Sequence, residues 1–266
     1  MKVTKQNSKP GCPELRKSID HIKFPAWAEI KYDGEFTYVL HSPTTTCTVN
    51  KYGTVREDFP ALNQIRDTLN ANKVVAGIFL GELYFDGGKL NDIYKLNSNK
   101  SSDACELVLF DILQWNPECV TNYSLLDRKE LLAMCVGDLA IGGEVVADKA
   151  EATAFFEKAK ANGYEGVVIK EFDSHLVIGP CSWAKLKGKD QTDYKVLSVD
   201  VDKERIEVAV PYVDSSNNPT IVVLGCKAPN RYKKHIKIGD VVTIEHQGVL
   251  PSGSLRHPVL IPDPSW

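Results

Sequence analysis

The residues with the clearest chemical potential lie in positions 28–36, which read Ala-Glu-Ile-Lys-Tyr-Asp-Gly-Glu-Phe. Lys31 stands between apolar neighbours just before an acidic-glycine turn. Burial disfavours the charged form of an amine and lowers its pKa, which is how a lysine becomes a nucleophile at neutral pH. Asp33 follows two residues later, so an extended strand would point both side chains to one face. Gly34 permits close approach of the backbone to a ligand. A short motif of this kind is more often an ordinary hairpin with a solvated lysine, so the hypothesis depends on the rest of the chain.

Strands are the elements that must position this lysine. Aromatic and β-branched residues on both sides of the turn predict a hairpin of Ala28–Lys31 and Phe36–Leu40. Apolar runs predict further strands over residues 44–49, 74–85, 107–113, 164–170 and 183–187. Helical spacing and capping residues predict helices over 59–69, 125–135 and 150–161, and a short one around 14–19. The N-terminal region is therefore of the α+β class.

Several charged residues interrupt strands that otherwise look like core. They are Glu82, Glu165, Lys170, Lys185 and Lys187. Lysine and glutamate are rarely buried unless paired or liganded, so charges on several core strands indicate a cavity between sheets. Lysines with carboxylates suit a polyphosphate and its metal. Phe110 is the lone aromatic residue of its strand, where it either packs in the core, as composition favours, or stacks on a base.

After Gly188-Lys189-Asp190-Gln191, which has the composition of a hinge, the pattern changes to short strands only. They are predicted over residues 194–201, 205–210, 220–224 and 240–247. Short strands separated by turns are typical of a small β-barrel. The sequence therefore predicts two domains, residues 1–188 and 189–266.

Bulk properties exclude several classes of protein. The chain has 266 residues with 43% hydrophobic and 25% charged residues, and no apolar run is long enough to span a membrane. Seven scattered cysteines without a CxxC pair favour reduced thiols, and hence a cytoplasmic location, or the host-cell cytoplasm for a viral protein. The net charge of −3 gives no general attraction to nucleic acid.

A nucleic-acid site must therefore be a local basic patch. The best candidate lies in the predicted β-barrel and consists of Lys227, Arg231, Lys233, Lys234 and Lys237. An isolated charge run is more often a solvated loop, but phosphate contacts are what hold a nucleic acid in place.

Five motifs in this order resemble those of the covalent nucleotidyltransferases, and most of all small ATP-dependent DNA ligases of viral and bacterial type. They are KYDG (31–34), GELYFD (81–86), LVLFDIL (107–113), YEGVVIK (164–170) and WAKLK (183–187). One such motif is weak evidence, whereas five in order are strong. The resemblance implies an ATP-grasp-like adenylation domain of packed, mostly antiparallel sheets, followed by an OB-fold domain.

The resemblance also implies a role for each matching residue. Lys31 would attack the α-phosphate of ATP and carry AMP, and Asp33 would position or activate the attacking group in later steps. Glu165 would bind the divalent metal, Mg²⁺ or Mn²⁺, with Glu82 beside it. Lys185 and Lys187 would hold the α-phosphate.

Other residues would form the nucleotide pocket. Glu29 would contact adenine, Glu82 the ribose, and Phe110 would stack on the base. The resemblance also places Ile30 and Lys170 in the nucleotide pocket. Where such ligases carry a basic residue before a turn glycine, this chain has Lys51, which would substitute as a phosphate contact.

The chain departs from the pattern at two further places. Phe36 stands where these ligases usually carry an arginine, and the C-terminal tail 260–264 lacks the usual basic residues. Arg256, which precedes the tail, would partly compensate as a nucleic-acid contact.

The implied partner is nicked duplex DNA, bound by a monomer, with RNA-containing ends as an alternative. An RNA ligase of the same superfamily, an mRNA-capping guanylyltransferase and an inactive OB-containing binding module remain open as other functions.

Overall fold

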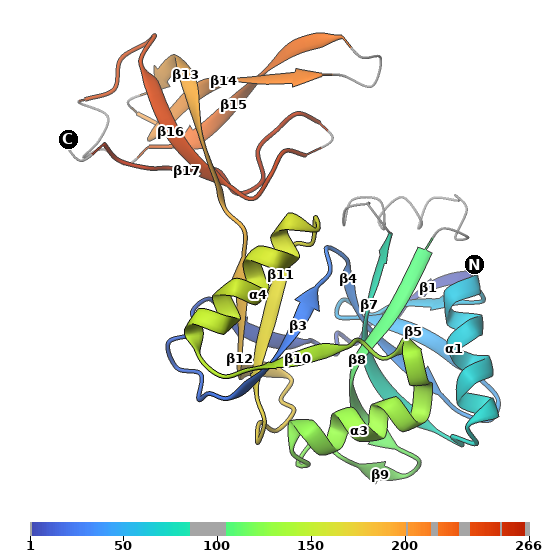
Figure 1. Ribbon diagram of the computed structural model, residues 1–266. Helices are drawn as coiled ribbons and strands as arrows, with labels where there is room; N and C mark the ends of the chain where they lie inside the picture. The colour runs from blue at the N-terminus through green and yellow to red at the C-terminus, as the bar shows by residue number, and fades with distance from the viewer. Residues whose placement is uncertain are drawn as a thin grey trace. The chain divides into compact units, whose positions relative to one another are not determined.

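The computed structural model describes residues 2–85, 105–200, 202–213, 218–228, 235–250 and 252–263. The chain divides into two compact units, Met1–Leu186 and Lys187–Trp266. The boundary lies two residues before the one predicted from the sequence. Figure 1 shows helices in the first unit, whereas the labelled elements of the second are strands.

The larger sheet of the first unit is antiparallel, in the order β1-β6-β5-β4-β7-β8-β9. Its strands are β1 (Lys2–Lys5), β4 (Glu35–His41), β5 (Thr46–Asn50), β6 (Thr54–Glu57), β7 (Gly77–Phe85), β8 (Cys105–Trp115) and β9 (Glu118–Cys119). The apolar runs that predicted β4, β5, β7 and β8 lie at the centre of this sheet, where neighbours cover both edges of each strand.

The smaller sheet has the order β10-β3-β11-β12-β2. Its strands are β2 (Pro13–Arg16), β3 (Ala26–Lys31), β10 (Gly143–Val146), β11 (Gly166–Glu171) and β12 (Gly179–Lys187). The short helix predicted around residues 14–19 is wrong, because residues 13–16 form β2 and pair in parallel with β12. A neighbouring strand supplies the hydrogen bonds that a helix would have made within itself.

Helices cover the outer faces of the two sheets. They are α1 (Pro60–Ala71), α3 (Leu125–Val136) and α4 (Lys149–Ala161), with a short 3₁₀ helix at Gly137–Leu139. The Asp148 carboxylate caps α4 by accepting from the backbone N–H groups of Ala150 and Glu151 at 2.8 and 2.9 Å. In Figure 1, α4 lies beside β3 and β11, whereas α1 and α3 lie beside the larger sheet.

The two sheets meet through a shared core. Tyr38 and Leu80 of the larger sheet pack with Cys181 and Trp183 of the smaller one, and Phe110 borders this cluster. Residues of both sheets therefore pack against one another in this layer, and the predicted cavity between the sheets stays a prediction.

The second unit is an antiparallel sheet of five strands in the order β15-β14-β13-β16-β17. The strands are β13 (Asp190–Asp200), β14 (Arg205–Val213), β15 (Pro219–Lys227), β16 (Val241–His246) and β17 (Val259–Leu260). Asp190 and Gln191, predicted as part of a hinge, instead pair with His246 and Glu245 of β16. Only residues 188 and 189 therefore lie between β12 and β13.

Candidate active site

Lys31 is the last residue of β3, and its side chain is 18% exposed. Its ammonium group donates a hydrogen bond to the carboxylate of Glu165 and lies 3.4 Å from the carbonyl oxygen of Tyr32. Gly166 pairs with Lys31 across the β3–β11 ladder, so Glu165 directly precedes the residue opposite the lysine. Backbone pairing thus brings residues 31 and 165 together.

The pKa of Lys31 is raised, which corrects the expectation from the sequence. Burial by itself lowers this pKa, but the negative charges of Glu82 and Glu165 outweigh burial, with a smaller contribution from Asp33. Burial raises the pKa of Glu82 to about 7, even though Lys31 opposes that rise. Glu82 and Glu165 therefore favour the ammonium form of Lys31 in the free site.

Asp33 lies in the bend after β3 and not on the strand, so the predicted alternation of strand side chains does not apply to it. The bend is pressed against β7. A Cβ atom on Gly34 would lie 2.4 Å from the carbonyl oxygen of Leu83 and 2.8 Å from Cγ of Glu82. Glycine is therefore required for close approach to β7, which holds the bend and Glu82 in contact.

Glu29 lies two residues before Lys31 and is almost fully buried. Its carboxylate is 2.6 Å from the Lys170 ammonium, forms an ion pair with Lys129, and accepts a hydrogen bond from the Trp27 indole at 2.9 Å. Burial, with the nearby charge of Lys170, lowers the pKa of Lys129 to about 8, although Glu29 opposes this change.

Sequence analysis missed Lys129. The signal that could have found it is helical spacing, because Lys129 lies one turn after Leu125, which is buried on the inner face of α3. A lysine at such a position needs a partner, and Glu29 is that partner.

Aromatic side chains form a wall beside this buried charge. The Lys170 nitrogen lies 5.0 Å from the ring centre of Phe110 and 4.2 Å from that of Trp183. Phe36, which replaces the expected arginine, lies with its ring centre 6.1 Å from that of Phe110. The substitution therefore extends an apolar surface at a place where the resemblance predicted a cation.

Lys51, in the turn after β5, and Lys185, on β12, lie toward the same region. Burial raises the pKa of the Cys12 thiol, and the charges of Lys51, Glu82 and Lys185 all act on that thiol, so these groups gather around it. Lys187 ends β12 and begins the second unit. Its predicted contact with the α-phosphate stays a prediction.

The turn that carries Lys51 is well anchored. The Asn50 side-chain oxygen accepts from the backbone N–H groups of Tyr52 and Thr54 at 2.9 and 2.8 Å. Its amide nitrogen donates to Glu35 at 2.9 Å, and Glu35 is ion-paired with Arg56 at 2.6 Å in the interior. This network fixes the start of the turn and therefore the position of Lys51.

Ile30 contributes no side chain to the lysine site. It packs in the core beneath α4, on the opposite face of β3 from Glu29 and Lys31. Only its backbone remains available to a nucleotide.

The predicted basic patch is described in part. Lys227 is exposed at the end of β15, Lys237 follows in the next loop, and Arg256 is half-buried. Arg231, Lys233 and Lys234 lie outside the described residues. The role of this patch stays a prediction.

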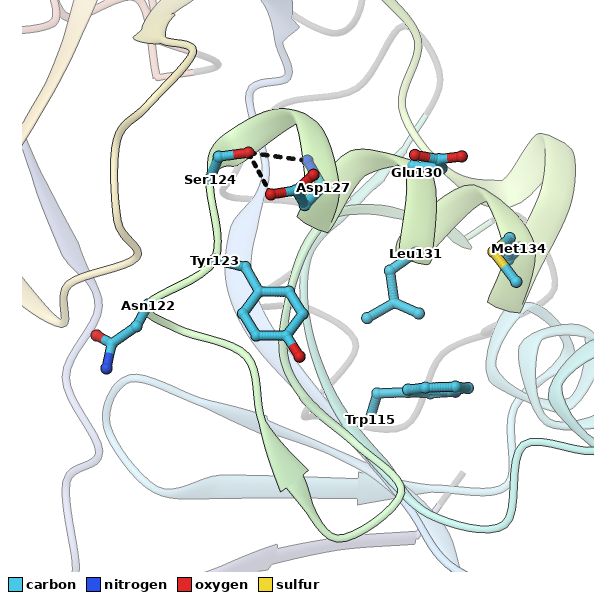
Figure 2. A pocket seen from close by; sticks show the side chains of 8 residues that line it. All are labelled: Trp115, Asn122, Tyr123, Ser124, Asp127, Glu130, Leu131 and Met134. Atoms are coloured by element: carbon cyan, nitrogen blue, oxygen red, sulfur yellow. Dashed lines mark hydrogen bonds between the residues drawn. The ribbon is translucent and has the colours of Figure 1, made fainter.

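A cavity of about 460 Å³ lies elsewhere on the first unit (Figure 2). It is lined by Trp115, Asn122, Tyr123, Ser124, Asp127, Glu130, Leu131 and Met134. The Ser124 hydroxyl, drawn in Figure 2, caps α3 by accepting from the backbone N–H of Asp127 at 3.2 Å. None of the residues predicted to do chemistry lines this cavity, so it is separate from the lysine site.

Comparison with known families gives one decisive match. A family model described as the ATP dependent DNA ligase domain matches residues 10–187. The chain belongs to this family. Membership makes this ligase an enzyme that uses ATP, and the matched region contains all five motifs found in the sequence. A search of curated protein sequences found no match.

Solved structures agree in fold with this ligase. A structure from a study of DNA binding by Lig E DNA ligases has a TM-score of 0.67 and 16% identity, covering 95% of this chain and 98% of that one. Mycobacterial DNA ligase D complexed with ATP and MES has a TM-score of 0.54 and 18% sequence identity, and the match covers 95% of each chain. The ATP-dependent DNA ligase from bacteriophage T7 in complex with ATP has a TM-score of 0.51 and 16% sequence identity, and the match covers 96% of this chain and 99% of that one. This likeness confirms the predicted fold of an adenylation domain followed by an OB-fold domain. Within the described residues, no helix is long and apolar enough to cross a membrane.

Proposed function

We propose that this ligase seals breaks between a 5′-phosphate and a 3′-hydroxyl in duplex DNA, through an AMP group carried on Lys31. The observation that carries this proposal is the arrangement of groups along β3. Glu29 lies between two lysines beside the Phe110 ring, which suits a base, and Lys31 lies further along among carboxylates, which suits a phosphate. The two residues are about 6.6 Å apart along the strand, so one nucleotide can contact both.

The first transfer needs Lys31 as a free amine. Its nitrogen attacks the α-phosphorus of ATP, a phosphorus–nitrogen bond forms, the bond to the β-phosphate oxygen breaks, and pyrophosphate leaves. The ammonium must lose a proton, and Glu165 already accepts a hydrogen bond from it. Lys185 and Lys51 would neutralise charge on the phosphates.

Two further transfers complete the reaction. A 5′-phosphate oxygen attacks the phosphorus of the lysyl-AMP, the phosphorus–nitrogen bond breaks, and the lysine takes up a proton. The 3′-hydroxyl then attacks the activated 5′-phosphorus, loses its proton and expels AMP. Lys227 and Lys237 of the OB-fold domain, with the rest of the basic patch, would contact the DNA backbone.

The residues present fit a divalent cation. Glu82 and Glu165 both raise the pKa of Lys31, so two carboxylates lie close to this amine. Among the described residues no group of three or more acidic, histidine or cysteine side chains is set to hold a metal. Mg²⁺ commonly binds through one or two carboxylates with water and substrate phosphates. Glu165 and Glu82 would hold it, and the ion would supply positive charge to the phosphates.

Joining of RNA-containing ends is a second candidate, which Phe36 favours. Its ring packs toward Phe110 at a position where the DNA-joining relatives suggested by the motifs carry an arginine. That position therefore offers no positive charge to a phosphate.

The test uses ATP labelled at the α-phosphate. Label should appear on the protein with Mg²⁺, disappear in Lys31→Ala, and persist in Lys149→Ala, whose exposed lysine pairs with Asp20 at 2.8 Å. Label from GTP alone would indicate a capping enzyme, and label from neither nucleotide an inactive binding module. Nicked duplexes with DNA or RNA on each side of the break then separate the two ligase candidates.

A further inference from the structure

Three tyrosines gather beside the lysine. The ring centre of Tyr32 lies 4.3 Å from that of Tyr84, with the rings tilted, and 5.6 Å from that of Tyr164, edge to face. Tyr164 is 40% exposed, and the other two rings are half-buried. We call these three residues the tyrosine cluster.

Each member lies within two residues of a residue of the candidate site. Tyr32 follows Lys31, Tyr164 precedes Glu165, and Tyr84 lies two residues after Glu82 on β7. Three separate segments of the chain therefore each contribute one tyrosine and one residue of the candidate site.

Strand register places the whole cluster at one end of the site. Val168 pairs with Glu29 and Gly166 with Lys31, so Tyr164 lies beyond the lysine, on the side away from Glu29. The bend after Lys31 meets β7 at the same end, because a Cβ atom on Gly34 would lie 3.0 Å from Cβ of Tyr84. The order along the site is therefore the Glu29 region, then Lys31 with its carboxylates, then the tyrosine cluster.

This order restricts what the cluster can bind. If the base of AMP lies near Glu29 and its phosphate at Lys31, the tyrosine cluster lies beyond the phosphate. Pyrophosphate leaves on that side in the first transfer, but aromatic rings offer no positive charge to hold it. The 5′-phosphate of the polynucleotide arrives on that side in the second transfer, and the nucleoside attached to it exposes at the break its sugar and one face of its base, which can pack on aromatic rings.

We propose that the tyrosine cluster binds the terminal nucleoside that carries the 5′-phosphate and so positions that phosphate against the lysyl-AMP. This inference rests on the proposed function and names a substrate-positioning site within it. The tyrosines are positioning residues: they hold the polynucleotide and leave the attack on ATP to Lys31.

The experiment separates the two steps. Tyr164→Ala is compared with the unmodified protein for lysyl-AMP formation from ATP alone, and then for transfer of AMP from preformed lysyl-AMP to a nicked duplex in a single turnover. We expect lysyl-AMP formation to change less than twofold and AMP transfer to fall by about 5- to 100-fold, as for loss of one base-stacking contact. Tyr164→Phe should restore transfer, because it keeps the ring.

Tyr123→Ala is the matched control, because Tyr123 is 39% exposed in the same unit and lines the separate cavity of Figure 2. It should leave both steps unchanged. Equal loss of both steps in Tyr164→Ala would overturn the inference in favour of a packing role for the ring, and an unchanged transfer step would overturn it outright. If the unmodified protein forms no lysyl-AMP, the proposed function fails and this inference fails with it. If only the transfer result differs from expectation, the proposed function stands.

Discussion

Gly34→Ala tests whether close approach of the bend to β7 is what places Lys31. The new Cβ would lie 2.4 Å from the Leu83 carbonyl oxygen, about 0.6 Å inside the 3.0 Å limit that real Cβ atoms respect. The obstacle is backbone within a paired strand, so the bend must move and not the obstacle. A shift approaching 1 Å in an active site can cost on the order of 100-fold in rate. We therefore expect lysyl-AMP formation to slow by about 10- to 100-fold.

The assay is the rate at which label from ATP appears on the protein, measured together with the urea midpoint of unfolding. Overpacking of this kind costs about 1–3 kcal/mol, so the variant should still fold. Gly142→Ala is the matched control, because a Cβ atom there meets no atom within 4 Å. Wild-type rates of labelling in a folded Gly34→Ala protein would refute the reasoning, since the bend would then tolerate the displacement.

Three further predictions follow from buried groups. The pKa of Lys129 is about 8 in the folded protein, below the ordinary 10.5. Between these pH values the unfolded state binds more protons than the folded state, so the free energy of unfolding rises with pH. In Lys129→Met, the slope of unfolding free energy against pH from 8 to 10 should be smaller by up to about 1.4 kcal/mol per pH unit. Arg128→Met should lower the unfolding free energy by about 3–5 kcal/mol in urea titrations at pH 7. The fully buried Asp111, which pairs with Arg128 at 2.7 Å, would then be a buried charge without its partner. An unchanged unfolding free energy would show that this ion pair is energetically neutral. Asn50→Ala should slow lysyl-AMP formation severalfold by releasing the turn that carries Lys51, and Asn72→Ala, a similar side chain remote from that turn, should leave labelling unchanged.

The sequence predicted the elements whose information is local. Apolar runs indicated β7 and β8, and helical spacing after Pro60 indicated α1, because each pattern is written within the element itself. The short strand β2 was misread, since residues 13–16 become a strand only through their pairing with β12. Motif order predicted Lys31 and Glu165 as site residues, and pairing of β3 with β11 brings these two residues together.

Other properties of the site depend on neighbours that are distant in the chain. The partner of Glu29 on α3, Lys129, is a hundred residues away, and no spacing rule connects them. The direction of the pKa shift of Lys31 was wrong for the same reason: burial was visible in the sequence, whereas the number of carboxylates around the amine was not. Electrostatic balance is a sum over the folded neighbourhood, and a strand pattern contains only one part of that sum.

If Lys31 carries AMP as proposed, its raised pKa has opposite consequences for the two transfers in which the amine would take part. Glu82 and Glu165 stabilise the ammonium, so they oppose the first attack on ATP, which needs the lone pair of the nitrogen. In the second transfer the nitrogen is the leaving group, and an amine leaves more readily when it is protonated, so the same carboxylates favour departure. Cations bound to ATP would weaken the stabilisation of the Lys31 ammonium by these carboxylates, but only while ATP is bound. Once pyrophosphate had left, Glu82 and Glu165 would favour protonation of the nitrogen that carries AMP, and so would favour onward transfer of AMP.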